Sequence, residues 1–150
     1  MLKRMLKNEK GLTLIELLAV VVILGIIAAF AVPAIGGIID NTKKDAHVAN
    51  AQQMISATKL ALTADPDLAP IGATSTTVTL GDLITNGYLQ EKIKDPDDKA
   101  AGAYDEDESK VVINRPDKDS PQLTYTVTLK GSKREINGID EGELGRDKVE

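Results

Sequence analysis

Residues 17–39 form an uninterrupted apolar run, and this run constrains the fold more than any other feature of the chain. Its 23 positions contain no charged and no strongly polar side chain. At about 1.5 Å of rise per residue, a helix of this length spans the hydrocarbon core of a bilayer, which is about 30 Å thick. The chain of 150 residues therefore combines one membrane-type helix with a single domain of modest size.

A single carboxylate, that of Glu16, stands immediately before this run and directly after two apolar residues. An ionisable group at the bilayer centre costs at least about 2.5–3.5 kcal/mol on insertion scales, so Glu16 requires a partner or a function. The alternative is that Glu16 has no function and that its side chain extends to the edge of the membrane, where water solvates the charge. Upstream lies a short leader that ends at Gly11 and carries four basic residues, Lys3, Arg4, Lys7 and Lys10.

This arrangement resembles the N-terminal signature of type IV pilins and pseudopilins. Gly11 matches the residue before the cleavage site, Leu12 the first mature residue, and Glu16 the glutamate five residues into the mature chain. Phenylalanine is commoner than leucine at the first mature position. The resemblance implies that residues 1–11 are a class III signal peptide (a prepilin leader), that a prepilin peptidase cleaves after Gly11, and that the new amine of Leu12 is N-methylated.

The resemblance also implies how such a subunit assembles. The subunit waits in the cell (inner) membrane with its head outside the cytoplasm, and its helix then enters a filament core. Glu16 pairs there with the N-terminal amine of a neighbouring subunit, since a charge in a low-dielectric bundle is costly unless it is paired. The implied partners are other copies of the chain, minor pilins, the lipid bilayer, and a membrane assembly platform with its motor ATPase.

Pro33 falls where the family often has a helix-kinking proline. Proline removes one backbone hydrogen bond and kinks or breaks a helix. A bent helix would let subunits pack with a different rise in a filament. The alternative is a kink without consequence, as is common in transmembrane helices.

Two other interpretations of the N-terminus compete with this one. An ordinary secretory signal peptide would be cleaved after Ala31, and an unprocessed single-pass anchor would keep its leader. The apolar run continues past Ala31 to Ile39, and the charge of Glu16 is unusual for a signal peptide. The basic leader places the N-terminus in the cytoplasm under the positive-inside rule.

Beyond residue 39 the pattern becomes amphipathic, with Val48, Ala51, Ile55 and Leu62 on one helical stripe. The Asp65–Pro66 pair ends this helix. We therefore expect one long helix over residues 12–64. Its first half, residues 12–39, is the transmembrane or filament-core part, and its second half, residues 40–64, lays an apolar face on the head.

The fold class we expect is α+β and pilin-like, with the long helix packed on a small antiparallel sheet of about three strands. The head spans residues 65–139 and begins with a loop over residues 65–79. A short helix starts at Asp82 and is capped by Gly87. The expected strands are residues 111–114, 123–130 and 134–139, and the middle one alternates cleanly between apolar and polar side chains. Residues 140–150 are highly charged, and we expect a flexible tail.

Seven of the fourteen residues from 95 to 108 are acidic. Calcium takes six to eight oxygen ligands, so Asp95, Asp97, Asp105 and Asp107 are the expected ligands if a metal site exists here. The spacing of an EF-hand is absent, and a solvated acidic loop is the favoured interpretation. The chain has a single histidine, His47, and no cysteine, so we expect His47 to be a solvated helix residue rather than a metal ligand.

No catalytic constellation is present in the sequence, and we expect no enzyme. The formal net charge of −5 argues against direct nucleic-acid binding, which requires clustered Lys and Arg. The favoured function is a major pilin-like subunit of a type IV pilus-like filament at the cell surface or in the cell envelope. The alternatives are a pseudopilin of a type II secretion or competence (DNA-uptake) machine, and a membrane-tethered calcium-binding module that does not polymerise.

Overall fold

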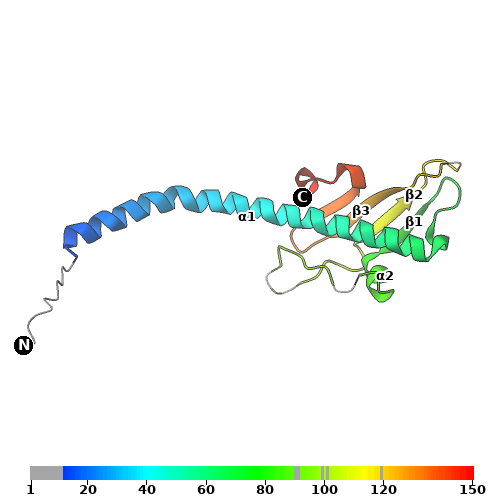
Figure 1. Ribbon diagram of the computed structural model, residues 1–150, viewed down its shortest axis with the longest axis horizontal. Coiled ribbons are helices and arrows are strands. Elements are labelled where there is room, and N and C mark those ends of the chain that lie inside the picture. Colours follow the sequence, from blue (N-terminus) through cyan, green and yellow to red (C-terminus); the bar gives the residue numbers. More distant parts are fainter. Residues whose placement is uncertain (1–11, 90–91, 99, 101, 119) are drawn as a thin grey trace, which may run out of the picture. The chain divides into compact units, whose positions relative to one another are not determined.

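The computed structural model of the chain describes residues 12–89, 92–98, 100, 102–118 and 120–150 (Figure 1). The chain divides into two compact units, Met1–Ile39 and Asp40–Glu150. One helix, α1 (Leu14–Ala64), belongs to both. This helix confirms the single long helix expected from the sequence. Residues 14–39 of this helix fall in the first unit and residues 40–64 in the second.

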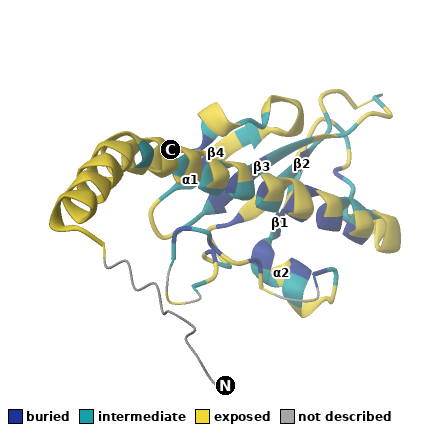
Figure 2. Cartoon of the chain, turned by 60° about the vertical axis from the view of Figure 1, so that its left-hand side comes forward, coloured by how far each residue is buried: buried dark blue, intermediate teal, exposed yellow. Residues whose placement is uncertain are grey.

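The first part of α1 carries its apolar side chains almost entirely on the outside (Figure 2). Leu14 is 84% exposed and Phe30 is 76% exposed. The helix is long and apolar enough to cross a membrane by length and composition. Pro33 lies inside α1, where it cannot donate a backbone hydrogen bond. So large an apolar surface requires lipid or protein around it.

The second part of α1 packs on the head through a narrow apolar stripe. Ala51, Met54, Ile55 and Ala61 are at most 1% exposed. Their spacing of three to four residues places them on one face of the helix, which Figure 2 shows as the buried face. The stripe predicted over residues 40–64 is therefore the face that packs on the head, with Ala51 and Ile55 buried and Val48 and Leu62 partly buried.

The head contains a four-stranded antiparallel sheet in the order β1-β2-β3-β4. The strands are β1 (Ser75–Thr79), β2 (Lys110–Asn114), β3 (Thr124–Lys130) and β4 (Glu135–Asp140). The last three confirm the predicted strands to within a residue or so at each end. Val111, Ile113, Val127, Leu129 and Ile136 are fully buried between the sheet and α1. The α+β, pilin-like fold class is confirmed.

Strand β1 was not predicted, because residues 65–79 were expected to be a loop. The loop holds only as far as residue 74, and it includes a short 3-10 turn at Pro66–Leu68. β1 pairs with β2 along its whole length, from Ser75 opposite Asn114 to Thr79 opposite Lys110. Its β-branched threonines suit an extended chain, but only Val78 is buried, so the strand lacks the alternating apolar signal.

The short helix α2 (Leu80–Thr85) begins two residues earlier than predicted. Thr79 is its N-cap, and Thr79 and Asp82 form a capping box, so Asp82 is the third helical residue rather than the first. Gly87 adopts a positive φ of 77° beyond the end of the helix, as predicted. The N–H of Tyr88 donates to the carbonyl of Leu83 at 2.9 Å, which completes a Schellman ending.

Residues 140–150 are folded back on the head, which differs from the flexible tail that we expected. Glu150 exchanges two backbone hydrogen bonds with Glu135 of β4, and Val149 is buried. The guanidinium of Arg146 donates two hydrogen bonds to Asp45 of α1, at 2.8 and 2.6 Å. The charges that resembled a solvated tail therefore find complementary partners on the folded head.

Candidate functional site

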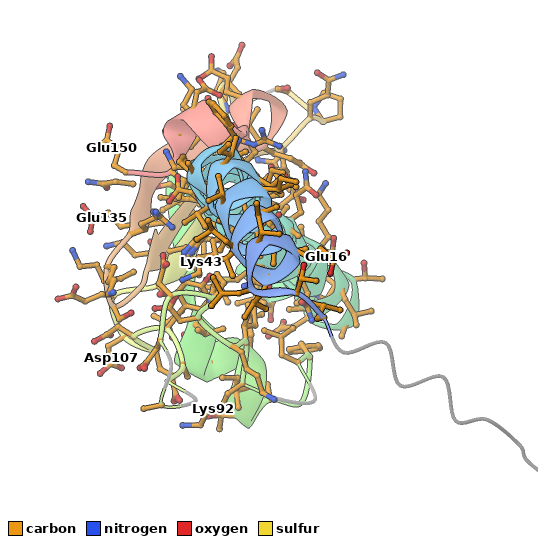
Figure 3. The ribbon with its side chains drawn as sticks, turned by 90° about the vertical axis from the view of Figure 1, so that its left-hand side faces the viewer. Glu16, Lys43, Lys92, Asp107, Glu135 and Glu150 are labelled. Atoms are coloured by element: carbon orange, nitrogen blue, oxygen red, sulfur yellow. The ribbon has the colours of Figure 1, made fainter. Side chains whose placement is uncertain are left out.

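The residues expected to act in processing and docking precede α1 in the sequence or belong to its first turn. Gly11 lies outside the described residues, and Leu12 is 71% exposed at the start of the described chain. Both the backbone N–H and the hydroxyl of Thr13 donate to Glu16 Oε2 at 2.8 Å. The N–H of Glu16 donates in return to Thr13 Oγ1 at 3.3 Å. Figure 3 shows Glu16 on this first turn.

These reciprocal bonds make Thr13 and Glu16 a capping box, a motif that our sequence interpretation missed although its Thr-x-x-Glu pattern is present. The carboxylate of Glu16 is thus held by its own chain at the helix start. Both hydrogen bonds donated by Thr13 fall on Oε2, and a carboxylate accepts on both of its oxygens. Glu16 therefore keeps acceptor capacity for an incoming cation.

A second candidate site lies inside the head, around His47. This histidine is 1% exposed, so the expectation of a solvated helix residue is wrong. Its Nε2 lies 3.0 Å from Asp97 Oδ2 and 3.8 Å from Asp95 Oδ1. Its Nδ1 lies 2.7 Å from the hydroxyl of Tyr104. His47 faces inward because it occupies the same side of α1 as the apolar stripe, one turn before Ala51.

The hydrogen bonds around Tyr104 determine which nitrogen of His47 carries the proton. Asn50 Nδ2 donates to the Tyr104 hydroxyl at 3.0 Å. Burial raises the pKa of Tyr104 well above its usual value, so the phenol keeps its proton and its hydroxyl can donate a hydrogen bond to His47 Nδ1. His47 Nε2 then carries the ring proton and donates to Asp97. This tautomer satisfies every member of the chain of hydrogen bonds.

Asp97 forms ion pairs with two basic side chains, one from α1 and one from the turn before β4. Lys43 Nζ lies 3.1 Å from Asp97 Oδ1, and Arg134 Nη1 lies 3.0 Å from Asp97 Oδ2. Arg134 also pairs with Asp40 at the start of the head unit. Burial alone would raise the pKa of Asp97, but the hydrogen bonds from His47 and Lys43 outweigh it and lower that pKa below its ordinary value.

Asp95 is held mainly by backbone donors. The N–H of Ser132 donates to Asp95 Oδ2 at 2.6 Å, and the N–H of Asp97 donates to Asp95 Oδ1 at 2.8 Å. Burial acts to raise the pKa of Asp95, and these two bonds outweigh it, so the pKa is lowered. The set of residues joined in this way is called the Asp97 network below: Asp40, Lys43, His47, Asn50, Asp95, Asp97, Tyr104, Ser132 and Arg134.

Of the four predicted calcium ligands, the structure brings only Asp95 and Asp97 together. In the part of the chain that the structure describes, these two and His47 are the one group of side chains spaced closely enough to share a metal ion. Asp105 instead accepts the N–H groups of Asp107 and Glu108 within its own turn. Figure 3 places Asp107 on the loops at the edge of the head. Calcium binding stays a prediction, and a cation would have to compete with Lys43 and Arg134.

Sequence reasoning did not find the Asp97 network as a whole. A signal for it exists, because Asp40, Lys43, His47 and Asn50 recur every three or four residues and so share one side of α1. Their partners could not be identified from the sequence, since Asp97 is 50 residues from His47 and 37 residues from Arg134.

Residues 6–32 match the family model described as the prokaryotic N-terminal methylation motif. The matched segment includes Leu12, Thr13 and Glu16 and continues into the apolar part of α1. Comparisons with curated proteins and with solved structures give no match. The motif confirms the resemblance to the class III signal peptide of type IV pilins and pseudopilins, and it supports prepilin-type processing. It also favours a structural role.

Proposed function

We propose that this chain is a major pilin-like structural subunit that polymerises into a type IV pilus-like filament. A prepilin peptidase cleaves it after Gly11, and the amine of Leu12 is then N-methylated. The observation that carries the proposal is the methylation motif over residues 6–32, which continues into a helix whose apolar surface is exposed over residues 14–39. A helix exposed in this way needs either a bilayer or other helices around it.

Before assembly, the first half of α1 spans the cell membrane, with the leader in the cytoplasm and the head outside. During assembly the same apolar side chains exchange lipid for the helices of neighbouring subunits. The other components are an assembly platform, its motor ATPase and minor pilins. The final location is a filament at the cell surface or in the cell envelope.

Glu16 is the residue that joins one subunit to the next in this proposal. Its carboxylate, already oriented by Thr13, receives the N-terminal amine of the neighbouring subunit. Pairing two charges in a low-dielectric helical bundle is favourable only when both are satisfied, so an unpaired Glu16 would be excluded from the finished filament. Each subunit is thereby placed in one register relative to the last. The alternative within this class is a pseudopilin of a secretion or competence machine.

The first test is mass spectrometry of the N-terminal peptide of the protein isolated from its native cell. A mature chain that starts with N-methylated Leu12 is the expected result. A chain that starts at Val32 would identify an ordinary secreted protein, and a chain that keeps its leader would identify an unprocessed anchor. Either of these two results would overturn the proposal.

The second test replaces Glu16 with alanine. The variant should insert into the membrane normally but form no filaments, as measured by the amount of subunit recovered in the sheared surface fraction. A membrane-tethered module that never polymerises has no use for Glu16. Filaments in normal amount from the variant would reject the docking role.

A further inference from the structure

The contacts of α1 with the head change character along the helix. From residue 40 to residue 50, the side chains that bind the head are mainly polar and charged. Among the described residues of α1, the fully buried apolar positions begin only at Ala51. A chain that enters the head from residue 39 therefore meets the Asp97 network before it meets the apolar stripe.

The partners of this polar stretch come from three separate parts of the head. Asp97 and Tyr104 belong to the segment between α2 and β2. Arg134 precedes β4, and Arg146 belongs to the C-terminal 3-10 turn η3 (Arg146–Lys148). About 15 Å of helix, at about 1.5 Å per residue, is thus bonded to three pieces of chain that are far apart in sequence.

Polar and apolar contacts resist displacement along the helix differently. Apolar burial is non-directional, and the stripe includes small side chains such as Ala51 and Ala61, so it specifies the axial position of α1 less sharply than directional bonds do. Hydrogen bonds tolerate only a narrow range of distance and angle. A slip of one residue, about 1.5 Å along the axis, would separate His47 and Lys43 from Asp97 together. It would leave the buried Asp97 carboxylate with Arg134 as its one cationic partner among these three, which is unfavourable.

We propose that the Asp97 network is a register lock, which prevents α1 from sliding through the head and transmits tension between the two. This inference rests on the proposed function, because tension reaches the head through Asp40 only if residues 12–39 are held in a filament. Tension that enters at Asp40 acts first on Arg134, then on Asp97 through Lys43 and His47, and only afterwards on the apolar core. Asp97 is the centre of the lock because three of these bonds converge on its carboxylate.

The test pulls on single full-length chains in detergent micelles. The natural chain has no cysteine, so pairs of introduced cysteines provide unique handles. In the first geometry the handles are at exposed positions that flank the α1 residues of the lock, Ile39→Cys and Ile71→Cys. In the second geometry they are Ile71→Cys and Gly142→Cys, so that tension enters through the C-terminal segment instead. The quantity measured is the rate of unfolding at constant force.

The variant Asp97→Asn removes the charge at the centre of the lock while keeping its shape. We expect unfolding at least about tenfold faster in the first geometry, since each loss of about 1.4 kcal/mol from a barrier is tenfold in rate. A clearly smaller acceleration is expected in the second geometry. Tyr104→Phe, which removes one hydroxyl, is the second variant if Asp97→Asn does not fold. Asp105→Asn, outside the network, is the control and should change neither rate.

Equal acceleration of unfolding in both geometries would overturn the proposal, because the network would then contribute only general stability. No acceleration in the first geometry would overturn it as well. The experiment uses isolated chains, so its failure is distinguishable from a failure of the filament proposal. That proposal is tested separately by the Glu16→Ala variant and by mass spectrometry of the N-terminal peptide.

Discussion

Thr13 and Glu16 bond each other in both directions across the first turn of α1. Glu16, the residue expected to dock the subunit, is therefore also part of the capping box at the N-terminus of α1. A carboxylate oriented in this way is presented to an incoming amine in one conformation. Orienting it in advance reduces the rotamer entropy that docking would otherwise cost.

Removing the cap and removing the carboxylate should have different effects on assembly. We expect Thr13→Ala to lower the yield of filaments without abolishing it, because Glu16 keeps its charge but loses the hydroxyl bond that helps to orient it. Thr13→Ser, which restores the hydroxyl, should assemble at the normal level. The measurement is the quantity of subunit in sheared filaments. A complete loss of filaments in Thr13→Ala, equal to that of Glu16→Ala, would contradict a role limited to capping.

Gly131 should tolerate no side chain, because it lies between the turn before β4 and the Asp97 network. A Cβ atom at this position would lie 2.6 Å from the carbonyl oxygen of Arg134 and 3.1 Å from Asp95 Oδ2. Since the nearest obstacle is backbone, Gly131→Ala should lower the free energy of unfolding by about 1–3 kcal/mol. Chemical denaturation of the full chain in micelles measures this change.

Gly142→Ala provides the matched control for that substitution. A Cβ atom at Gly142 meets nothing within 4 Å, so the free energy of unfolding should stay within experimental error. If Gly131→Ala were equally neutral, the β3–β4 turn would have to be displaced from the network in solution.

Acid should weaken the head through Asp95 and Asp97. Both carboxyl groups have pKa values lowered by folding, so in the unfolded chain they bind protons first, near the ordinary value of about 3.9. Their contribution to stability is present above about pH 4 and is lost as the pH falls further towards the folded pKa values. The melting temperature should fall over this range, and Asp97→Asn should flatten the fall. An unchanged slope in Asp97→Asn would show that other carboxylates cause it.

Calcium should leave the melting temperature of the chain unchanged up to millimolar concentration. Asp95 and Asp97 are already satisfied by backbone N–H groups, Lys43 and Arg134, and a cation would have to displace the last two. A ligand that binds only the folded state raises stability with its concentration. A calcium-dependent rise that disappears in Asp97→Asn would therefore identify a calcium site and contradict this expectation.

The elements that could be predicted are those whose own side chains carry an apolar signal. The long helix and strands β2–β4 have such a signal, and the structure confirms them. β1 could not be predicted because its extended form depends on pairing with β2, while only Val78 among its side chains is buried. The packing of residues 146–150 was missed for a similar reason, since the partner of Arg146 is 101 residues away.

The candidate sites also differ in how far they could be predicted from the sequence. Leu12 and Glu16 could be proposed from the sequence because their signature depends on the local order of residues, and the matched methylation motif spans both. His47 could not be assigned correctly, because burial of an imidazole depends on carboxylates that only the folded head brings to it. A single charge pattern is compatible with a solvated surface or with a buried network, and only the tertiary contacts distinguish them.

The pairing of Glu150 with Glu135 has a consequence for crowded assemblies of this protein. The outer edge of β4 would otherwise offer unpaired backbone donors and acceptors to any strand that approached it, which is a common route to aggregation. Glu150 occupies part of that edge in each molecule. Heads brought to high local concentration along a filament are thereby kept from joining one another's sheets at β4, and they remain separate folding units.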